Sequence, residues 1–264
     1  MKISYEQFLQ YYDINTGDLL LYKTTYWYSR LIEYFSHSPY SHVGLICKRS
    51  DVFDTCIAEN GETMDDYFVF ESGYEQYLGT AGGGGVCGSG QVLYDTQNKS
   101  PCSKWGVQLF PLRDVYRQYI VGDSGDLYIR KLRMYRNGSD GDDDMLRTRY
   151  ELLRLNLRNV YRHCINKPYD TTMYDWVVSY YEQDADESTL EQFRNCQRTD
   201  CFWCSAFVGY LFVICRLAKR DTPWSLLTPN DFSTYQNPKR IQWVDCDYDR
   251  EVQVSKNVVE YAFV

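Results

Sequence analysis

Residues 200–217 read Asp-Cys-Phe-Trp-Cys-Ser-Ala-Phe-Val-Gly-Tyr-Leu-Phe-Val-Ile-Cys-Arg-Leu, and they place a cysteine, Cys204, where a strongly apolar helix begins. The N-terminus of a helix carries partial positive charge and free N–H groups, and both lower the pKa of a thiol. We expect this helix to run from Cys204 to about Lys219, because Pro223 and Pro229 mark the loop that follows.

A histidine lies far upstream, in the segment Tyr40-Ser-His-Val-Gly-Leu-Ile46. The apolar, β-branched residues around His42 predict a strand from His42 to Cys47, which would hold the imidazole still. An imidazole beside a thiol activates it, so the two segments contain the minimum parts of a cysteine nucleophile. Cys201 is the rival nucleophile, but it lies three residues before the apolar face of the helix.

The remaining apolar runs predict a sheet with a few helices. Strands are expected at Leu19–Tyr22 after a turn at Thr16–Asp18, at Tyr67–Glu71 closed by Ser72-Gly73, at Val107–Leu112, at Asp126–Met134, at Ile241–Val244 and within Glu251–Val264. Helices are expected at Tyr26–Phe35, Met145–Cys164 and Met173–Tyr181, and loop at Lys48–Asp66. The 26 Tyr, 12 Phe and 6 Trp residues also favour strands and protein interfaces. The chain is therefore expected to form an α+β domain with an antiparallel sheet.

Two segments resemble ligand-binding loops at first sight. The glycine-rich stretch 79–90 lacks the Lys-Ser/Thr pair of a phosphate-binding loop, which favours a flexible loop or lid. Asp140, Asp142, Asp144 and Glu151 have calcium-loop offsets, but Met145 occupies the position that needs glycine. An acidic cap on the following helix explains the run more simply.

The charge balance and the cysteines narrow the classes of partner. A formal net charge of −8 argues against nucleic acid, and the arginines of the helix Met145–Cys164 are expected to form a solvated face. The first residues lack an apolar core and no apolar run approaches twenty residues, so we expect a cytoplasmic protein without a transmembrane segment. In that compartment most of the ten cysteines are small buried hydrophobes, and one CxxC pair with three histidines argues against a metal site.

The order of the two catalytic parts is the reverse of that in papain-like enzymes, which usually carry the cysteine helix before the histidine strand. Six segments follow one another in the chain: Gly17-Asp18-Leu-Leu, Tyr40-Ser-His-Val-Gly-Leu-Ile46, Val69-Phe-Glu-Ser72, Asn166-Lys-Pro-Tyr-Asp170, Phe202-Trp-Cys-Ser-Ala-Phe-Val208 and Thr228-Pro-Asn-Asp231. In this order they resemble the circularly permuted branch of the NlpC/P60 papain-like superfamily. That branch contains YiiX-like bacterial proteins and poxviral virion proteins, and it is related to the lecithin:retinol acyltransferase-like group.

The resemblance implies one permuted papain-like domain over residues 1–264. Asn166 stands where the family has glycine, and Ala206 stands where an acidic residue is common. Residues 73–125 look like an insertion, and residues 236–264 like a strand-prone C-terminal extension.

The resemblance also assigns roles. Cys204 would be the nucleophile, His42 the general base and later the acid, and Glu71 the group that orients the imidazole. Tyr169 would be a second oxyanion donor, beside the N–H of Cys204, or a substrate contact. Alternatives for the third group are Glu59, Glu62 and Asp66, whereas His37 and His163 are expected to be structural.

The implied activity is hydrolysis of a peptide-like amide or an ester through an acyl-enzyme, without a cofactor. One alternative is a lipid acyltransferase or lipase acting at membranes, for which Trp27, Trp203 and Trp224 would supply apolar contacts. The other is a non-catalytic structural component of a large-virus particle, in which aromatic surfaces would bind assembly partners.

Overall fold

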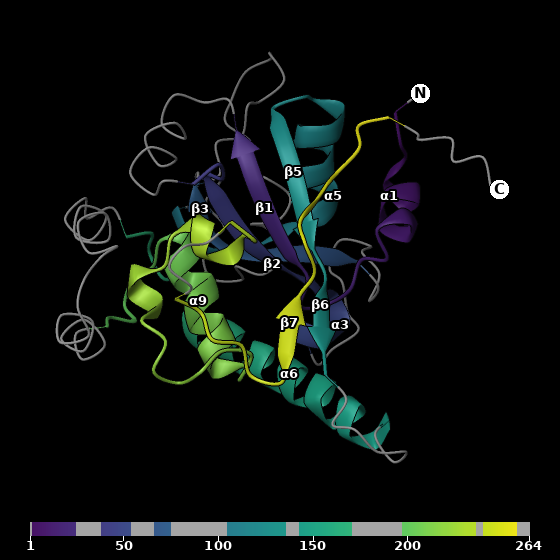
Figure 1. Cartoon of the computed structure of the whole chain (residues 1–264). Helices are drawn as coiled ribbons and strands as arrows, with labels where there is room; N and C mark the ends of the chain where they lie inside the picture. The colour runs from purple at the N-terminus through teal and green to yellow at the C-terminus, as the bar shows by residue number, and fades with distance from the viewer. Residues whose placement is uncertain are drawn as a thin grey trace.

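A sheet of six antiparallel strands organises the part of the chain that the structure describes (Figure 1). The structure is a computed structural model, and it describes residues 2–24, 38–53, 66–74, 105–135, 143–170, 197–235 and 240–257. The strand order is β4-β3-β2-β1-β5-β8. The strands are β1 (Leu19–Thr24), β2 (His42–Lys48), β3 (Tyr67–Tyr74), β4 (Trp105–Pro111), β5 (Gly125–Arg130) and β8 (Val252–Gln253). A second sheet pairs β6 (Leu132–Met134) with β7 (Cys246–Tyr248).

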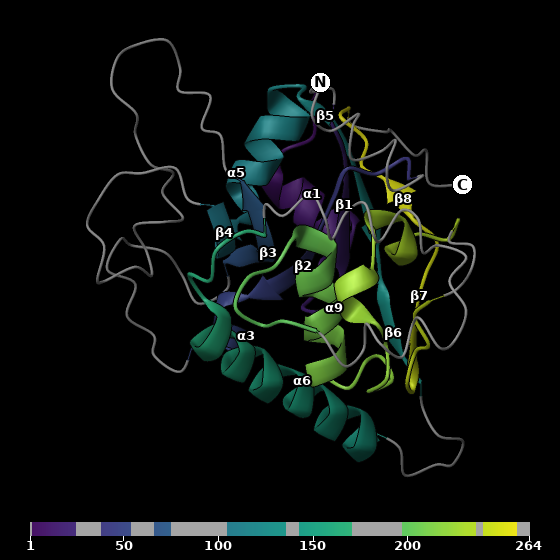
Figure 2. The ribbon, with the colours of Figure 1, turned by 90° about the vertical axis from the view of Figure 1, so that its left-hand side faces the viewer.

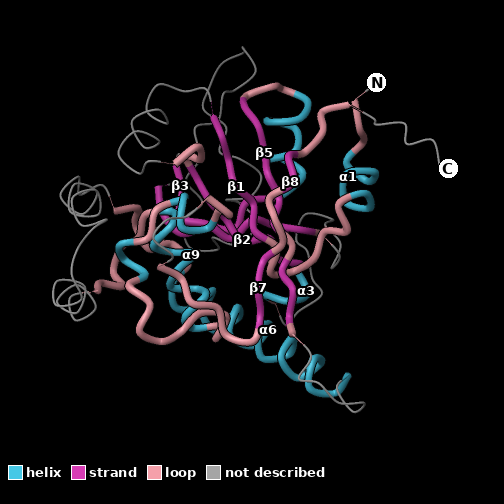
Figure 3. Tube along the Cα trace, in the orientation of Figure 1, coloured by secondary structure: helices cyan, strands magenta, loops and turns pink. Residues whose placement is uncertain are grey.

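Helices lie on both faces of the large sheet, which appears as a magenta layer between them in Figure 3. They are α1 (Tyr5–Tyr11), α3 (Arg49–Val52), α5 (Leu112–Tyr116), α6 (Asp143–Cys164) and α9 (Cys204–Ile214), with a π-helical turn η1 (Arg117–Val121) and 3-10 turns η2 (Trp224–Leu226) and η3 (Pro229–Phe232). The expected α+β class with an antiparallel sheet is confirmed. None of the helices in the described ranges has the length and apolar content needed to cross a membrane.

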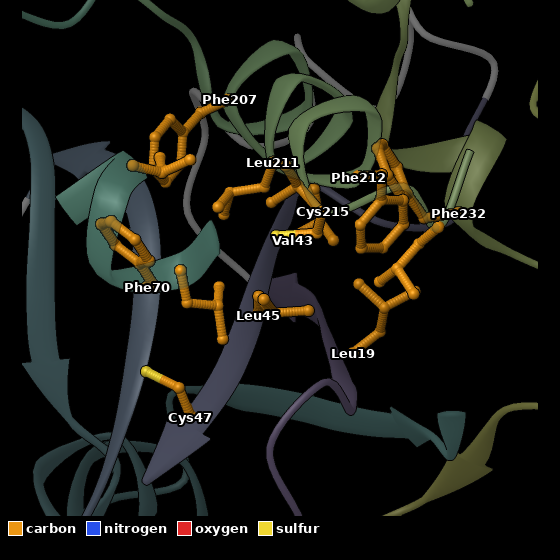
Figure 4. Packing of buried hydrophobic residues seen from close by; sticks show 14 of the residues in the cluster. Leu19, Val43, Leu45, Cys47, Phe70, Phe207, Leu211, Phe212, Cys215 and Phe232 are labelled. Carbon is orange, nitrogen blue, oxygen red and sulfur yellow. The ribbon is translucent and has the colours of Figure 1, made fainter. Parts of the chain in front are cut away.

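Alternation along the strands divides the core into two parts, because successive side chains of a strand point to opposite faces. Leu19 and Leu21 join the cluster beneath α6 and α9, whereas Leu20 and Tyr22 join the cluster beneath α1 and α5. Figure 4 shows Leu211 and Phe212 of α9, and Cys215 directly after it, pointing toward the strands. In the turned view of Figure 2, α9 lies in front of β2. The helix that begins with Cys204 therefore packs on one face of the sheet.

The helix α9 ends at Ile214, five residues earlier than expected. Arg216 adopts a left-handed conformation with φ 59°, and this turns the chain away from the helix axis. The N–H of Leu217 then donates to the carbonyl of Phe212 at 2.9 Å. This bond closes the last turn in the manner of a Schellman cap. The residues up to Lys219 therefore leave the helix although their sequence continues the pattern.

Other strand boundaries also differ from expectation. Ser72 and Gly73 do not close β3 but continue it, because they pair with β4. The expected strand Asp126–Met134 is two strands in different sheets, broken at Lys131. Lys131 Nζ and the N–H of Leu132 both bind the buried carboxylate of Asp18, at 2.6 and 3.1 Å, and this bends the chain.

The secondary structure predicted for two further segments was wrong. Within the loop expected at residues 48–66, the chain forms the short helix α3. Residues 241–244 form no strand. They pair with the segment after α9 only through an isolated β-bridge between Trp243 and Ala218. The strand β7 follows instead at Cys246–Tyr248.

Several expectations fall on residues outside the described ranges. These are the helices at Tyr26–Phe35 and Met173–Tyr181, the glycine-rich stretch 79–90, and the residues His37, Glu59, Glu62 and Trp27. Of the segment 73–125, the structure describes residues 73–74, which end β3, and residues 105–125, which include β4 of the sheet and α5 on its face.

Candidate active site

Four polar side chains lie in a row across strands β1 to β4, on one face of the sheet. Tyr22 is directly opposite His42, and Glu71 is directly opposite Gln108. The pairing of Leu45 with Phe70 fixes the register between β2 and β3. Continued along both strands, it puts Gly44 opposite Glu71 and Gly73 opposite His42, so His42 and Glu71 are diagonal neighbours.

The glycines give His42 and Glu71 the space to meet. A Cβ atom on Gly44 would lie 2.3 Å from Cγ1 of Val69 and 3.2 Å from Oε2 of Glu71. A Cβ atom on Gly73 would lie 3.2 Å from both Oε1 of Glu71 and Cε1 of His42. Nε2 of His42 consequently lies 2.9 Å from Oε2 of Glu71. The glycine of the His-Val-Gly segment is thus explained by the carboxylate packed against it.

Glu71 is 7% exposed, so hydrogen-bond donors from the protein must take the place of water around its carboxylate. Oε2 accepts from His42 and, at 3.3 Å, from the hydroxyl of Tyr22. Oε1 accepts from Nε2 of Gln108 at 3.4 Å. The Tyr22 ring also meets the His42 ring edge-on, with centroids 4.9 Å apart. Three strands therefore contribute donors to a carboxylate on the fourth.

The neighbouring residue of β3, Ser72, points to the other face and holds the segment before α9. Its hydroxyl donates to the carbonyl of Phe202 at 2.6 Å. On the far side of Cys204, the carbonyl of Leu227 accepts from Nε1 of Trp203 at 3.2 Å and from Oγ of Ser205 at 2.6 Å. The first residue of the helix is therefore held on both sides. No side chain caps the helix at Trp203, so its first N–H groups receive no acceptor from the cap.

His42 and Cys204 come together at this point, since the sulfur of Cys204 is one of the groups that raise the pKa of His42. Because Nε2 faces Glu71, the ring nitrogen left for the thiol is Nδ1. Burial disfavours the imidazolium, but the negative charge of Glu71 and the sulfur of Cys204 outweigh it and raise the pKa of His42 to about 10. Cys204 is 4% exposed, whereas 21% of the His42 side chain is exposed, so solvent reaches the pair from the imidazole side.

Tyr169 reaches the same cysteine from a segment that docks on the edge of β4. The N–H of Val107 donates to the carbonyl of Lys167 at 2.9 Å, and the N–H of Asn166 donates to the carbonyl of Val107 at 3.1 Å. Asn166 has φ 69°, a left-handed conformation that asparagine tolerates better than most residues. This explains how it can stand where glycine was expected.

Tyr169 lies close enough to Cys204 for its hydroxyl to interact with both the backbone and the sulfur of that residue. Its pKa is raised well above the ordinary value, chiefly by burial and then by the sulfur. A phenol that stays protonated can donate to a negatively charged atom near the sulfur. The structure therefore brings together all four residues singled out from the sequence: Cys204, His42, Glu71 and Tyr169.

The other cysteines of the described ranges are poor nucleophiles. Burial, followed by the charges of Asp170 and Asp200, raises the pKa of Cys201 to about 11. Burial also raises the pKa of Cys47, Cys164 and Cys215, and that of Cys246 to about 11. A raised pKa makes these thiols ionise less readily than a free cysteine, which argues against Cys201 as a nucleophile.

Two other candidates lie away from the site. The ring of His163 is exposed on α6 and contacts the carbonyl of Asn159 at 2.7 Å. Asp66 precedes β3, at the end of the strand remote from Glu71, and its carbonyl accepts from Arg49. Among the residues that the structure describes, no group of His, Cys, Asp and Glu side chains is arranged to hold a metal ion.

Sequence reasoning missed Tyr22 and Gln108. Each is the polar member of an apolar strand, in Leu-Leu-Leu-Tyr and Val-Gln-Leu-Phe respectively. A polar residue in an otherwise apolar strand signals a buried polar partner. Which residue is that partner depends on strand order and register, and the sequences of these two segments do not reveal either.

Comparisons with known proteins find little. No family model matches the chain, and no curated protein matches it. Among solved structures, the metalloprotein YiiX from Escherichia coli O157:H7 is similar with a TM-score of 0.36 and 18% sequence identity. The match covers 78% of this chain and 69% of that one. A likeness of this size assigns no role to any residue of the chain.

Proposed function

We propose that this protein is a cysteine-dependent hydrolase with a permuted papain-like fold, which cleaves a peptide-like amide or an ester through an acyl-enzyme on Cys204. The observation that carries the proposal is the position of one imidazole. The His42 ring contacts the carboxylate of Glu71, and the sulfur of Cys204 is close enough to raise the pKa of the same ring. A thiol, a base and a group that orients the base are the three parts of this chemistry.

The first half of the reaction forms the acyl-enzyme. The raised pKa of His42 keeps the shared proton on the imidazole, and the sulfur of Cys204 attacks the carbonyl carbon of the substrate. A C–S bond forms, and the electron pair of the C=O bond moves onto oxygen. The N–H of Cys204 and the hydroxyl of Tyr169 are the donors available to this oxyanion. The C–N or C–O bond then breaks as His42 returns the proton to the leaving group.

The second half releases the product. His42, neutral again, takes a proton from water, whose oxygen attacks the thioester carbon. The C–S bond breaks, the thiolate forms again beside the protonated His42, and the carboxylic acid leaves. Glu71 keeps its charge throughout and stabilises the imidazolium each time it forms.

The alternative of a lipid enzyme at membranes loses part of its support. Trp203 and Trp224 are 6% and 7% exposed, so they belong to the core. Nε1 of Trp203 is engaged with the carbonyl of Leu227. These two side chains do not form the exposed apolar surface that an interfacial enzyme uses, and we favour the hydrolysis of peptide-like amides.

Alkylation by iodoacetamide tests the proposal directly. At neutral pH we expect rapid labelling that peptide mapping assigns to Cys204, and we expect Cys204→Ala to lose it. Cys201→Ala is the matched control and should label like the parent. His42→Ala should label slowly, because its thiol has no base. Equal labelling of the parent and Cys204→Ala would rule out Cys204 as the nucleophile.

The substrate class needs a second measurement. Muropeptide and γ-glutamyl amide panels are compared with acyl-lipid panels, using Cys204→Ala as the blank. Turnover of amides by the parent alone supports the proposal. Turnover of acyl lipids alone would replace it by the lipid alternative, and rapid labelling without any turnover would favour the non-catalytic role.

A further inference from the structure

We propose that Tyr22 and Gln108 are positioning residues, which hold the two carboxylate oxygens of Glu71 so that the His42 ring stays aimed at Cys204. This inference rests on the proposed function for its effect on rate, but its structural part stands on the contacts alone. Neither residue touches the thiol in any contact described above, so both would act through Glu71 and His42.

The position of Tyr22 suits this role. It is directly opposite His42, its ring packs edge-on against the imidazole, and its hydroxyl donates to the same oxygen that the imidazole contacts. The ring of Tyr119 also packs edge-on against Tyr22, with centroids 5.3 Å apart. Tyr119 belongs to the π-helical turn η1, a rare conformation that is frequent at functional sites. Tyr22 is thus held by Tyr119 while it contacts both members of the His42–Glu71 pair.

The buried amide of Gln108 supports the same role in another way. It is 4% exposed, and its Nε2 donates to Oε1 of Glu71 from directly opposite. Its own Oε1 is buried and has no hydrogen-bond partner among the described residues. A buried polar atom without a partner destabilises a fold, so an apolar residue would suit the sheet better here. The glutamine is therefore explained by its contact with Glu71 and not by the stability of the strand.

Together the two donors fix both ends of the carboxylate. Tyr22 restrains Oε2 and Gln108 restrains Oε1, at 3.3 and 3.4 Å. Hydrogen bonds to a carboxylate also favour its charged form. Without them Glu71 can rotate away from His42, and its negative charge is held less firmly. The pKa of His42, which that charge raises against burial, should then fall.

The test uses Tyr22→Phe, Gln108→Leu and the double variant, in the full chain. The Cε1–H resonance of His42 is titrated by NMR and assigned with His42→Gln. We expect the His42 pKa to fall by about 1 unit in the double variant and by less in each single one. We expect kcat to fall about tenfold in each single variant while KM changes less than about twofold. Gln108→Leu should unfold within a few degrees of the parent, because removing its unpartnered oxygen offsets the donor that Glu71 loses.

Tyr116→Phe is the matched control. Tyr116 is another buried tyrosine of the same layer, but its hydroxyl donates to the carbonyl of Ile3. This variant should lower stability and leave the His42 titration unchanged. A double variant with the parent's His42 titration would overturn the inference. The inference would also be overturned if the fall in kcat of Gln108→Leu matched the fraction of that variant that is unfolded.

The two proposals fail in different ways. If the parent shows neither labelling at Cys204 nor turnover while the His42 pKa still falls in the double variant, the positioning role holds and the hydrolase does not. If the parent is active and both the titration and kcat of the double variant match it, the hydrolase stands and the positioning role is wrong.

Discussion

His42 and Glu71 are diagonal neighbours on β2 and β3, with Nε2 of the ring 2.9 Å from Oε2 of the carboxylate. Side chains on this diagonal are usually 7–8 Å apart at their Cα atoms, and only long or ring-shaped side chains reach across. The glycine opposite each partner leaves the space open. The pair forms because two glycines and two reaching side chains alternate on adjacent strands.

The first prediction concerns pH. Replacing Glu71 by Gln removes the charge that raises the pKa of His42 to about 10, while burial continues to lower it. The His42 pKa should therefore fall well below the parent's value in Glu71→Gln, where Cys204 alone still raises it. A folded pKa above the unfolded value means that His42 stabilises the fold below about pH 6.5, and that this stability is lost as pH rises through about 10.

Urea unfolding measures this effect as a difference between two proteins. Between about pH 6 and about pH 9 the parent should lose more stability than Glu71→Gln, because the His42 pKa of the parent lies further above the unfolded value. Groups elsewhere titrate alike in both proteins and cancel. Parallel stability curves for the two proteins would contradict the ion pair.

The second prediction separates the two glycines. In Gly44→Ala the new methyl group would overlap the fully buried side chain of Val69, so we expect a loss of about 2 kcal/mol of unfolding free energy. In Gly73→Ala the contacts with Glu71 and His42 are tight at 3.2 Å but can be relieved. This variant should fold nearly as well as the parent and react more slowly with iodoacetamide. Urea titration and labelling rates measure both effects, and equal stability losses would refute the assignment.

Much of the fold follows from local patterns. The histidine strand, the helix Met145–Cys164 and the start of α9 each have an apolar period that the structure reproduces. The ends of elements were harder to predict. Asp18 breaks the strand at Lys131 from more than a hundred residues away, and this contact leaves no trace in the strand's own sequence. The helix α9 ends locally, because Arg216 adopts a left-handed conformation that its residue type does not announce.

The site divides in the same way. Cys204 and His42 could be chosen because each type of residue has an intrinsic chemistry and an expected element around it. Glu71 and Tyr169 came only with the order of the motifs. Tyr22 and Gln108 could not be found, because moving a strand by one residue turns its side chains to the opposite face. The register that brings them to Glu71 is a property of the assembled sheet.

The third prediction concerns Arg130, which joins the large sheet to the C-terminal segment. The residue is 3% exposed, and its guanidinium donates to the carbonyls of Phe232, Tyr248 and Asp249 at 2.6, 2.9 and 2.7 Å. Arg130→Met leaves three carbonyls without this donor, so we expect a loss of about 3 kcal/mol in urea unfolding.

Arg133→Ala is the control for that measurement. Arg133 also binds the C-terminal segment, through Asp249 at 2.7 Å, but 64% of its side chain is exposed. An exposed ion pair contributes little, so this variant should unfold like the parent. If both arginine variants lost equal stability, general loss of positive charge would be the cause and not the buried hydrogen bonds.

The last prediction concerns Gly106, the glycine of β4 against which the segment of Tyr169 packs. Gly106 has φ 140°, and a Cβ atom there would lie 2.0 Å from the carbonyl of Lys167. Gly106→Ala should therefore detach residues 166–170 from β4 and move the Tyr169 hydroxyl away from Cys204. Tyr169→Phe removes the same hydroxyl without disturbing the backbone. We expect each variant to lower kcat/KM about tenfold, because each removes one donor from the developing oxyanion.

A double-mutant cycle decides whether the two residues act as one. If Gly106 affects the reaction through Tyr169, the double variant should be no slower than the slower single variant, since the hydroxyl can be lost only once. Independent roles would multiply the two effects to about a hundredfold loss. Measuring kcat/KM for the four proteins tells these results apart. A multiplicative loss would mean that the segment docked on β4 contributes to catalysis by something other than the phenol.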